Sequence, residues 1–235
     1  MNGSEERRRR LLQLVSAAAF LAVAVVLVLI VVNSSETDGG DTELEGVATA
    51  KRELRGIPQD GLALGEPVAE VTLYEYGDLQ CPVCKGFAED VVPDVIEAKV
   101  RSGEARIEFR NFTIINEESV PAAAAAIAAG EQTRGWDFLD VFYANQGQEA
   151  TGYVTDEFLA AIARAVGVPD IARWDEERES PVVLRRVQHE SEEAQRLGLT
   201  GTPSFAVTGP SIEGKEVLGT PGSAEALEEA IEAAG

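Results

Sequence analysis

The chain has 235 residues, of which 45% are hydrophobic and 26% are charged, a composition typical of a globular protein rather than a disordered one. Its formal net charge of −21 argues against a nucleic-acid binder, because such proteins neutralise phosphates with clustered Lys and Arg. Two Cys and one His offer at most three soft ligands, so a closed four-ligand zinc site is disfavoured and we predict neither a metal nor a cofactor.

The N-terminus carries a candidate membrane segment. Four arginines at positions 7–10 precede residues 11–32, a run of 22 residues without a charged side chain. A helix of that length spans about 33 Å, enough for a hydrocarbon core of about 30 Å, and the arginines favour a cytoplasmic N-terminus. We therefore predict a cytoplasmic basic segment over residues 1–10 and an uncleaved, single-pass signal anchor over residues 11–32 in the cell membrane. A cleaved signal peptide is the alternative, and both interpretations export everything after Asn33.

Residues 33–60 form a predicted flexible, acidic linker. Residues 33–41 are polar, acidic and Gly-rich, without apolar periodicity. A flexible coil of 28 residues reaches about 30 Å on average, which would hold the folded part, residues 61–235, near the membrane. Residues 33–235 carry 16 basic and 39 acidic side chains, and their net charge of −23 favours solubility and repels anionic lipid.

The folded part alternates between strand and helix patterns. Residues 70–76 are β-branched and aromatic, as in a strand, and a helical pattern begins at Pro82 and is interrupted at Pro93. With a second strand over residues 105–112, this order predicts a right-handed βαβ unit. A helical block and a ββα unit follow, with helices over 121–129, 136–143, 155–166 and 182–197, strands over 204–207 and 215–218, and a closing helix over 223–234 with Ser223 as N-cap. The aromatic stripe that starts at Trp136 favours a packed core over a peptide groove.

The first segment that carries chemistry is Cys81-Pro82-Val83-Cys84, at the predicted strand-to-helix junction. Cys81 falls at the N-cap, where free backbone N–H groups and the helix dipole stabilise a thiolate, so we expect its pKa below the ordinary value of about 8.5. Pro82 fits the first helical position, and Cys84, one turn inside the helix, should be more buried. These positions indicate that Cys81 is the exposed nucleophile and Cys84 the resolving thiol of a redox-active disulfide.

Three other uses of these cysteines fit the sequence less well. A metal half-site needs two further ligands, and the single histidine, His189, is expected at a solvated helix position beside Glu190. A purely structural disulfide that closes so short a loop contributes little stability. A Cys–His hydrolase centre is disfavoured because the second cysteine would oxidise with the nucleophile.

A second segment, Thr202-Pro203 directly before the late strand, completes a resemblance to a known family. X-Pro bonds are cis in only about one in twenty cases, so composition alone leaves this peptide bond open. Residues 74–85, 136–146 and 197–205 combine a CxxC motif with a late Gly-Thr-Pro before a strand. In this they resemble the DsbA-like branch of the thioredoxin superfamily, particularly its membrane-anchored, helix-inserted members, over about residues 57–234.

The resemblance implies an α/β thioredoxin fold with an inserted helical domain over about residues 117–198, preceded by a single N-terminal transmembrane helix. It also implies a cis Thr202–Pro203 bond that faces the Cys81 sulfur, with the Thr202 backbone pairing with a substrate peptide. Glu75, six residues before Cys81, matches the acidic residue that lies beneath the family's motif and relays protons to the inner cysteine.

The substrate is expected to lie against apolar residues beside the cysteines. Pro82 and Val83 fall within the motif, and Leu79 and Phe205 flank the two segments, so these side chains could hold unfolded polypeptide without reading its sequence. One departure from the family matters here. Its best-known oxidants have a histidine where this chain has Val83, so Cys81 should be less acidic and the couple less oxidising.

The predicted activity is thiol–disulfide exchange that oxidises reduced or unfolded exported client proteins in the extracytoplasmic space. The resemblance implies a membrane quinone-linked reoxidase as the electron acceptor, and the lack of a dimerisation domain favours a monomer. A disulfide reductase or isomerase with the same centre stays open, and so does a non-catalytic, membrane-tethered binding module or holdase.

Overall fold

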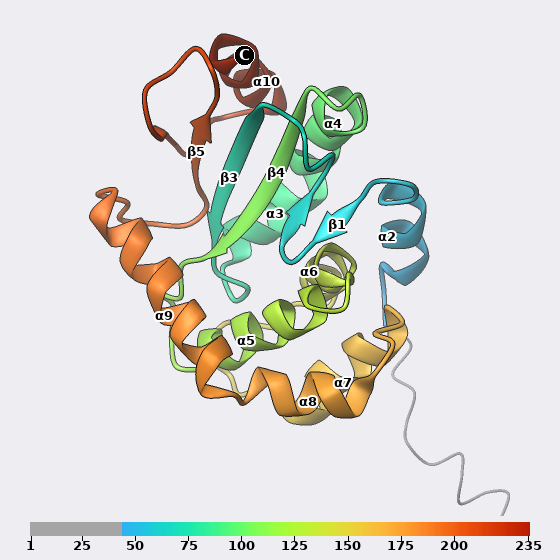
Figure 1. Cartoon of the computed structure of the whole chain (residues 1–235). Helices are drawn as coiled ribbons and strands as arrows, with labels where there is room; N and C mark the ends of the chain where they lie inside the picture. Colours follow the sequence, from blue (N-terminus) through green and yellow to red (C-terminus); the bar gives the residue numbers. More distant parts are fainter. Residues whose placement is uncertain (1–43) are drawn as a thin grey trace, which may run out of the picture. The chain divides into compact units, whose positions relative to one another are not determined.

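A six-stranded sheet runs through the computed structural model, which describes residues 44–235 (Figure 1). The strand order is β1-β2-β4-β3-β5-β6; β3 and β4 are parallel and every other neighbouring pair is antiparallel. The strands are β1 (Gln59–Asp60), β2 (Ala63–Leu64), β3 (Val71–Gly77), β4 (Ala105–Asn111), β5 (Ser204–Thr208) and β6 (Glu216–Gly219). The predicted βαβ and ββα units are therefore present, and the short β1–β2 hairpin is an addition that the sequence pattern does not predict.

The predictions for the N-terminus lie outside the described residues. They are the cytoplasmic basic segment over 1–10, the signal anchor over 11–32 and the first part of the linker, up to residue 43. Within residues 44–235, no helix combines the length and the apolar character needed to cross a membrane.

The two central strands are buried because both faces of the sheet are covered. On one face, Val71 and Leu73 of β3 join the main apolar core, which includes Leu227 of the last helix. On the other face, Tyr76 packs in a second, smaller cluster with Ala194 of helix α9. Alternate residues of a strand point to opposite faces, so the one strand β3 contributes to both layers.

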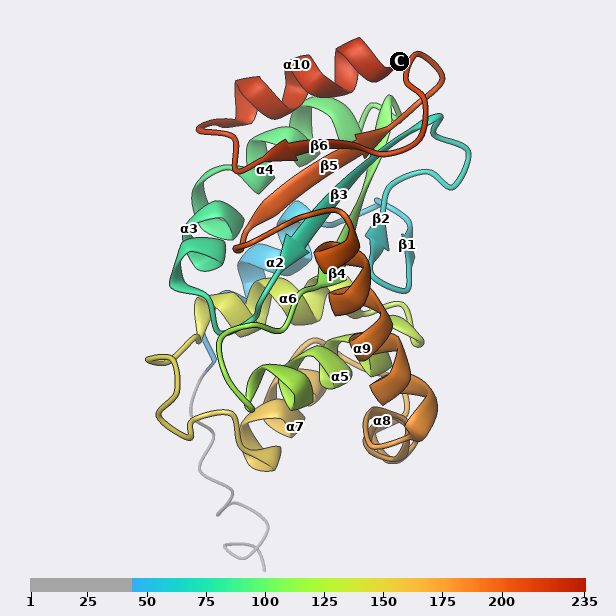
Figure 2. The same cartoon turned by 90° about the vertical axis from the view of Figure 1, so that its left-hand side faces the viewer.

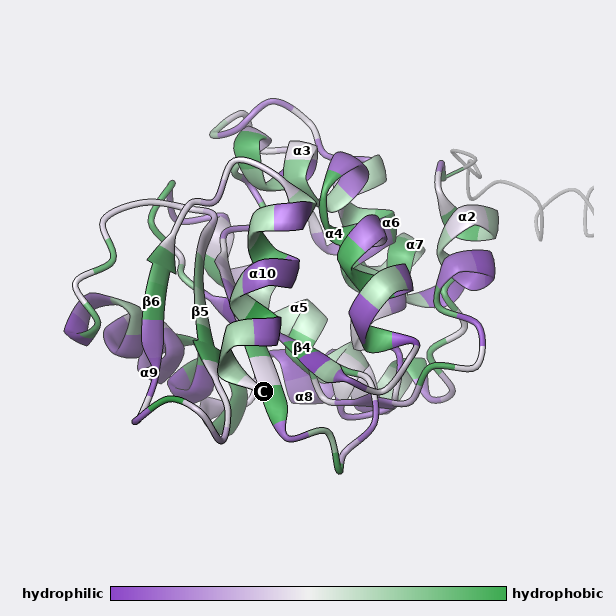
Figure 3. Cartoon of the chain, turned by 90° about the horizontal axis from the view of Figure 1, so that it is seen from above, coloured by the Kyte–Doolittle hydropathy of each residue, from purple (hydrophilic) through white to green (hydrophobic). Residues whose placement is uncertain are grey.

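The first face of the sheet is covered by the helices that follow the CxxC motif and by the C-terminal helix (Figure 2). They are α3 (Pro82–Asp90), α4 (Val92–Val95), the π-helical segment η1 (Ile96–Val100) and α10 (Ala224–Ala234). The helix predicted to begin at Pro82 is interrupted at Val91, between α3 and α4. The position of Pro93 predicts this interruption, because proline lacks the N–H that a continuous helix needs. Ser223 precedes α10 in an extended conformation, the predicted N-cap position. In Figure 3, hydrophobic and hydrophilic bands alternate along α10, as expected of a helix with one buried face.

Five helices lie between β4 and β5 and form the helical insertion (Figure 1). They are α5 (Ser119–Gly130), α6 (Gly135–Ala144), α7 (Asp156–Ala165), α8 (Ile171–Arg178) and α9 (Pro181–Arg196), of which the sequence pattern predicts all but α8. The alanine-rich residues 122–129 of α5 are all buried, and their small side chains let α6, α8 and α9 pack closely around α5. Trp136 and Phe142 are buried in the core, which confirms that the aromatic stripe is a packing surface.

Residues 44–60 belong to the folded unit, which corrects the prediction of a flexible linker as far as residue 60. Helix α2 (Val47–Glu53) and strand β1 lie within this stretch, and α2 packs against α6. Ala50, Leu54 and Ile57 are buried, which joins this stretch to the core of the folded unit.

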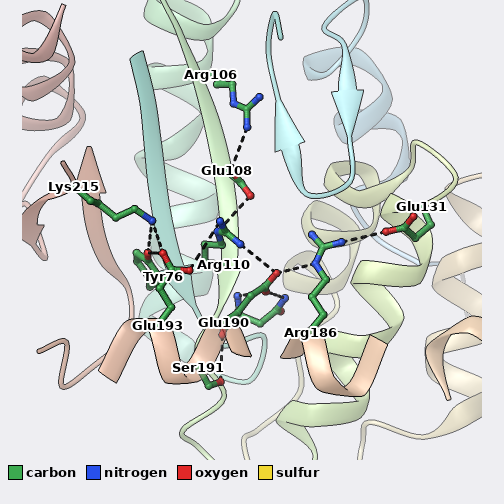
Figure 4. A network of polar contacts seen from close by, with 11 residues as sticks. Tyr76, Arg106, Glu108, Arg110, Glu131, Arg186, Glu190, Ser191, Glu193 and Lys215 are labelled. Atoms are coloured by element: carbon green, nitrogen blue, oxygen red, sulfur yellow. Dashed lines mark hydrogen bonds and ion pairs between the residues drawn. The ribbon is translucent and has the colours of Figure 1, made fainter. Parts of the chain in front are cut away.

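A network of charged side chains joins the insertion to the second face of the sheet (Figure 4). The carboxylate of Glu190 on α9 is fully buried and accepts hydrogen bonds from the backbone N–H of Asn111 at 3.0 Å, from its side-chain amide at 2.7 Å and from Arg186 Nε at 2.9 Å. One turn further along α9, Glu193 accepts from the hydroxyl of Tyr76 at 3.0 Å. Because a buried carboxylate is costly unless its partners are in place, these contacts fix α9 against β3 and β4.

Candidate active site

A tight turn at the end of β3 carries the CxxC motif to the start of α3. Asp78, which is 1% exposed, accepts the backbone N–H of Cys81 on its carbonyl oxygen at 2.9 Å. Its carboxylate accepts the N–H of Gln80 at 2.9 Å, and those of Ile114 and Ile115 at 2.8 and 3.0 Å. Asp78 therefore anchors the turn to the loop that follows β4.

Cys81 is the N-cap of α3, with φ −75° and ψ 120°, and Pro82 opens the helix, as predicted. Hydrogen bonds stabilise the Cys81 thiolate and lower the pKa of this thiol to about 6. The strongest comes from the thiol of Cys84; the side chain of Thr202 and the backbone N–H groups of Cys84 and Val83 add to it, and partial burial opposes them. The two N–H donors are the free groups at the helix start, which confirms the expectation of a low pKa.

Cys81 is less accessible than the sequence indicates. Only 4% of its surface is exposed, so the prediction of an exposed nucleophile is wrong; Thr202 lies against its sulfur. Cys84 is fully buried, deeper than Cys81 as predicted. Burial raises the pKa of the Cys84 thiol well above its usual value, and its hydrogen bond to Cys81 and the nearby charges of Cys81 and Glu75 add to the effect. At neutral pH the two thiols thus differ sharply, with Cys81 ionised and Cys84 protonated.

Glu75 lies on β3 among apolar side chains, and 3% of its surface is exposed. Burial raises the pKa of its carboxyl group to about 8. Its Oε1 atom has no hydrogen-bond partner within residues 44–235. With that pKa, the carboxyl group of Glu75 holds a proton at neutral pH. In its ionised form Glu75 raises the pKa of Cys84, so the two groups are close enough to interact electrostatically.

The second segment meets the first at this point. The Thr202–Pro203 bond is cis, as the resemblance implies, and the sulfur of Cys81 lies 3.4 Å from the carbonyl oxygen of Thr202. The hydroxyl of Thr220 donates to the carbonyl of Pro203 at 2.6 Å. β5 begins directly afterwards and pairs antiparallel with β3, with Ser204 opposite Tyr76, so the sheet itself brings the proline loop to the cysteines.

The apolar surface beside the cysteines is smaller than predicted. Val83 is 53% exposed, as a substrate-contacting residue must be. Leu79 and Phe205 are 2% and 0% exposed and belong to the core, where Phe205 packs against Phe87 with ring centroids 5.7 Å apart. These two residues cannot contact a client from inside the core. Ile114, which the sequence analysis does not single out, is 42% exposed on the loop held by Asp78.

Within residues 44–235, no three His, Cys, Asp or Glu side chains gather as ligands of an ion would. His189 is exposed on α9 beside the buried Glu190, at the solvated position expected for it.

Two residues that hold the motif in place are absent from the sequence-based predictions. They are Asp78, whose carboxylate accepts the N–H of Gln80, and Gln146, whose amide donates to the carbonyl oxygens of Leu79 and Cys81. Both fall inside the stretches that carry the family resemblance, which is the one signal that could have found them. Neither has reactive chemistry of its own that would mark it.

The arrangement suits exchange between thiols and disulfides. A thiolate at neutral pH is both a nucleophile and a good leaving group, and an adjacent protonated thiol can close a disulfide with it. Both cysteines are free thiols in the structure.

Known proteins share this architecture. Residues 58–233 match the family model described as Thioredoxin. The probable disulfide bond formation protein D of Bacillus cereus is 30% identical over 150 residues, which are 63% of this chain and 69% of that protein. The disulfide bond formation protein D of Bacillus subtilis is 26% identical over 162 residues, 68% of this chain and 71% of that protein. The crystal structure of oxidised BdbD from Bacillus subtilis superposes with a TM-score of 0.65 at 24% identity, covering 75% of this chain and 95% of that one.

The family match spans the motif, the insertion and the cis-proline loop, and the two Bacillus relatives carry the name of disulfide bond formation proteins. The chain therefore belongs to the thioredoxin family, as a DsbA-like protein thiol–disulfide oxidoreductase.

Proposed function

We propose that the chain is an extracytoplasmic thiol oxidase, which introduces disulfides into exported proteins through the Cys81–Cys84 pair. The observation that carries this proposal is the thiolate of Cys81, whose pKa is lowered to about 6. A stabilised thiolate stabilises the reduced form of the motif, so the oxidised form gives up its disulfide readily. The names of the Bacillus relatives support the same direction of reaction.

The reaction starts from the Cys81–Cys84 disulfide. A client thiolate attacks the sulfur of Cys81, and the sulfur of Cys84 leaves as a thiolate and takes up a proton. The second client thiolate then attacks the client sulfur of the mixed disulfide, and Cys81 leaves as a thiolate. Two electrons pass from the client to the motif, and the client departs with a new disulfide.

Glu75 is proposed as the proton source for the inner cysteine. Cys84 leaves as a thiolate in a site where burial strongly favours the thiol. A carboxyl group with a pKa of about 8 holds a proton at neutral pH and can supply it, directly or through water.

The client is proposed to lie across the cis-proline loop and the start of α3. The Thr202 backbone, next to the Cys81 sulfur, would pair with an extended client segment, with Pro203 setting the loop. Pro82 and the exposed Val83 would contact the client from the other side. Such contacts use backbone and apolar surface, so they suit many unfolded sequences.

The location and partners follow from the N-terminal sequence and the proposed direction. An anchor over residues 11–32, with residues 1–10 in the cytoplasm, would hold the oxidase at the outer face of the cell membrane. A monomer reoxidised there by a membrane quinone-linked partner would complete the cycle. An anchor is equally compatible with an oxidase, a reductase or isomerase, and a holdase, so it does not distinguish these functions.

A reductase or isomerase with the same centre is the second candidate, favoured by Val83 in place of a histidine. The redox potential of the Cys81–Cys84 couple, measured from its equilibrium constant with glutathione, distinguishes the oxidase from the reductase or isomerase. A potential between about −120 and −180 mV is expected of the oxidase, whereas a value near or below about −270 mV would contradict it. A non-catalytic holdase predicts that Cys81→Ser leaves activity in cells intact; our proposal requires that this variant loses it.

A further inference from the structure

The loop after α6 reaches the redox centre through one side chain, Gln146. Its amide nitrogen donates to the carbonyl oxygen of Leu79 at 2.7 Å and to that of Cys81 at 3.1 Å. These two carbonyls stand on either side of Gln80, in the turn that places Cys81 at the helix start. A single NH₂ group thus joins both ends of the segment 79–81.

The two acceptors depend on Gln146 to different degrees. Leu79 is 2% exposed, and no other hydrogen bond within residues 44–235 reaches its carbonyl oxygen. The carbonyl of Cys81 also accepts the first helical N–H, that of Lys85, at 3.2 Å. A buried carbonyl without a donor costs about 1–3 kcal/mol, so the turn would rearrange to regain a partner if Gln146 were lost.

Gln80 ties the same turn to the same part of the insertion. Its side chain is fully buried; its Oε1 atom accepts the backbone N–H of Ala150 at 3.0 Å and its amide donates to Asn116. The segment 145–150 therefore contacts the turn twice, through the side chain of Gln146 and through the backbone N–H of Ala150.

We infer that Gln146 is a positioning residue for the reactive sulfur: its two hydrogen bonds hold the turn so that Cys81 stays at the start of α3 and against Thr202. The inference rests on the proposed redox centre. It assigns the helical insertion a part in the chemistry, since the segment that follows α6 sets the geometry of the nucleophile.

The physical consequence concerns the thiolate. Cys81 owes its acidity to hydrogen bonds whose strength falls steeply with distance and angle. If the turn relaxes, the donors at Val83, Cys84 and Thr202 lose alignment and the thiolate loses stabilisation. A tenfold weaker stabilisation of the thiolate raises the pKa of Cys81 by one unit. Starting from a pKa of about 6, this lowers the equilibrium constant for oxidation of glutathione at pH 7 about fivefold, which is about 20 mV for a two-electron couple.

The test replaces Gln146 by methionine, which keeps the length and removes both donors. The matched control is Gln132→Met. Gln132 donates to the carbonyl of Asp170 at 2.9 Å and accepts its N–H at 2.8 Å, so it makes a comparable pair of backbone bonds inside the insertion. Both variants of the full-length chain, in detergent micelles, should lose thermal stability. Only Gln146→Met should raise the pKa of Cys81 by about one unit, read from the pH dependence of alkylation, and lower the glutathione equilibrium constant at pH 7 about fivefold.

The outcomes separate this inference from the proposed function. If Gln146→Met loses stability as Gln132→Met does, with Cys81 acidity and equilibrium constant unchanged, Gln146 is structural only and the inference fails. If Cys81→Ser retains turnover, the proposed redox centre fails instead.

A measurement on the unaltered chain covers the case in which Gln146→Met does not fold. The side-chain amide resonances of Gln146 should shift when Cys81 titrates in the reduced protein and when the disulfide forms, while those of Gln132 stay constant. Resonances of Gln146 that do not respond to either change would overturn the inference.

Discussion

The sulfur of Cys81 lies 3.4 Å from the carbonyl oxygen of Thr202, although 121 positions separate the two residues in the chain. The antiparallel pairing of β3 with β5 creates this proximity, because the motif follows the end of β3 and the cis-proline loop precedes β5. A thiol beside a free stretch of backbone can receive a client cysteine while the loop pairs with the client's main chain.

Removing either sulfur should have a distinct effect. Cys81→Ser removes the sulfur that the client attacks, so we expect oxidation of a reduced, unfolded client protein to fall to the uncatalysed rate. Cys84→Ser leaves a nucleophile without its partner and should trap client proteins as mixed disulfides. Gel electrophoresis without reductant resolves these species, and a Cys84→Ser chain that forms no client adduct would contradict the assigned roles.

The hydroxyl of Thr202 should tune the reactive thiol. Thr202→Val keeps the shape and removes one hydrogen bond to the Cys81 sulfur, which contributes to its low pKa. A bond of about 0.5–1.5 kcal/mol corresponds to a rise of up to about one pKa unit. Thiolate titration measures the shift, and Thr208→Val, at the far end of β5, is the control. Equal pKa values in the parent and in Thr202→Val would exclude the hydroxyl as a donor.

The ionisation of Cys81 should make the reduced protein more stable as the pH rises. Its pKa is lowered from 9.0 to about 6, so the stabilisation is complete above pH 9 and is lost as the pH falls through 6. At pH 7 it amounts to about 1.4 kcal/mol. Urea unfolding of the reduced chain and of Cys81→Ser between pH 5 and 9 measures it. The difference between the two should grow with pH, and a constant difference would contradict a low pKa.

Glu75 should reduce stability at neutral pH. Burial raises the pKa of its carboxyl group from 4.5 to about 8, so the protonated form is favoured by folding; this contribution is complete below pH 4.5 and is lost as the pH rises through 8. Glu75→Gln has no carboxyl group to ionise, so it avoids this loss of folding stability. The variant should be more stable than the parent at pH 7, by an amount on the order of 3 kcal/mol. Denaturant unfolding at pH 4.5 and 7 checks the trend.

The same variant tests the proposed proton transfer. Glu75→Gln cannot supply a proton to Cys84, so formation of the mixed disulfide should slow at neutral pH even though the protein is more stable. Stopped-flow mixing of the oxidised chain with a thiol client measures the step. A more stable variant that reacts at the parental rate would leave Glu75 without a part in the reaction.

The contacts of Glu190 should dominate the attachment of α9 to the sheet. Glu190→Ala leaves Asn111 and Arg186 without their buried partner, and we expect a loss of about 3–5 kcal/mol. Glu192→Ala is the control, because Glu192 is exposed on the same helix and its removal should change stability by less than about 0.5 kcal/mol. Both are measured by urea unfolding, and similar values for the two would contradict a buried, coupled network.

The sequence is informative about elements and about the first half of the site. Helix period and strand composition locate β3, α3, β4 and most of the insertion, and the spacing of Cys81 and Cys84 at a helix start predicts a low pKa. These features are local: each depends on neighbouring residues and on the geometry of one helix. Short or polar elements, such as β1 and α8, are missed because their packing depends on distant partners.

Which residues surround the sulfur is a matter of tertiary structure. Composition leaves the Thr202–Pro203 isomer open, and no local pattern places Thr202 against Cys81, buries Leu79 and Phe205, or directs Gln146 at the turn. These relations arise when β5 pairs with β3 and the insertion packs beneath the motif. The reactive group is thus determined by its own short segment, whereas its environment depends on contacts between residues that only the folded chain brings together.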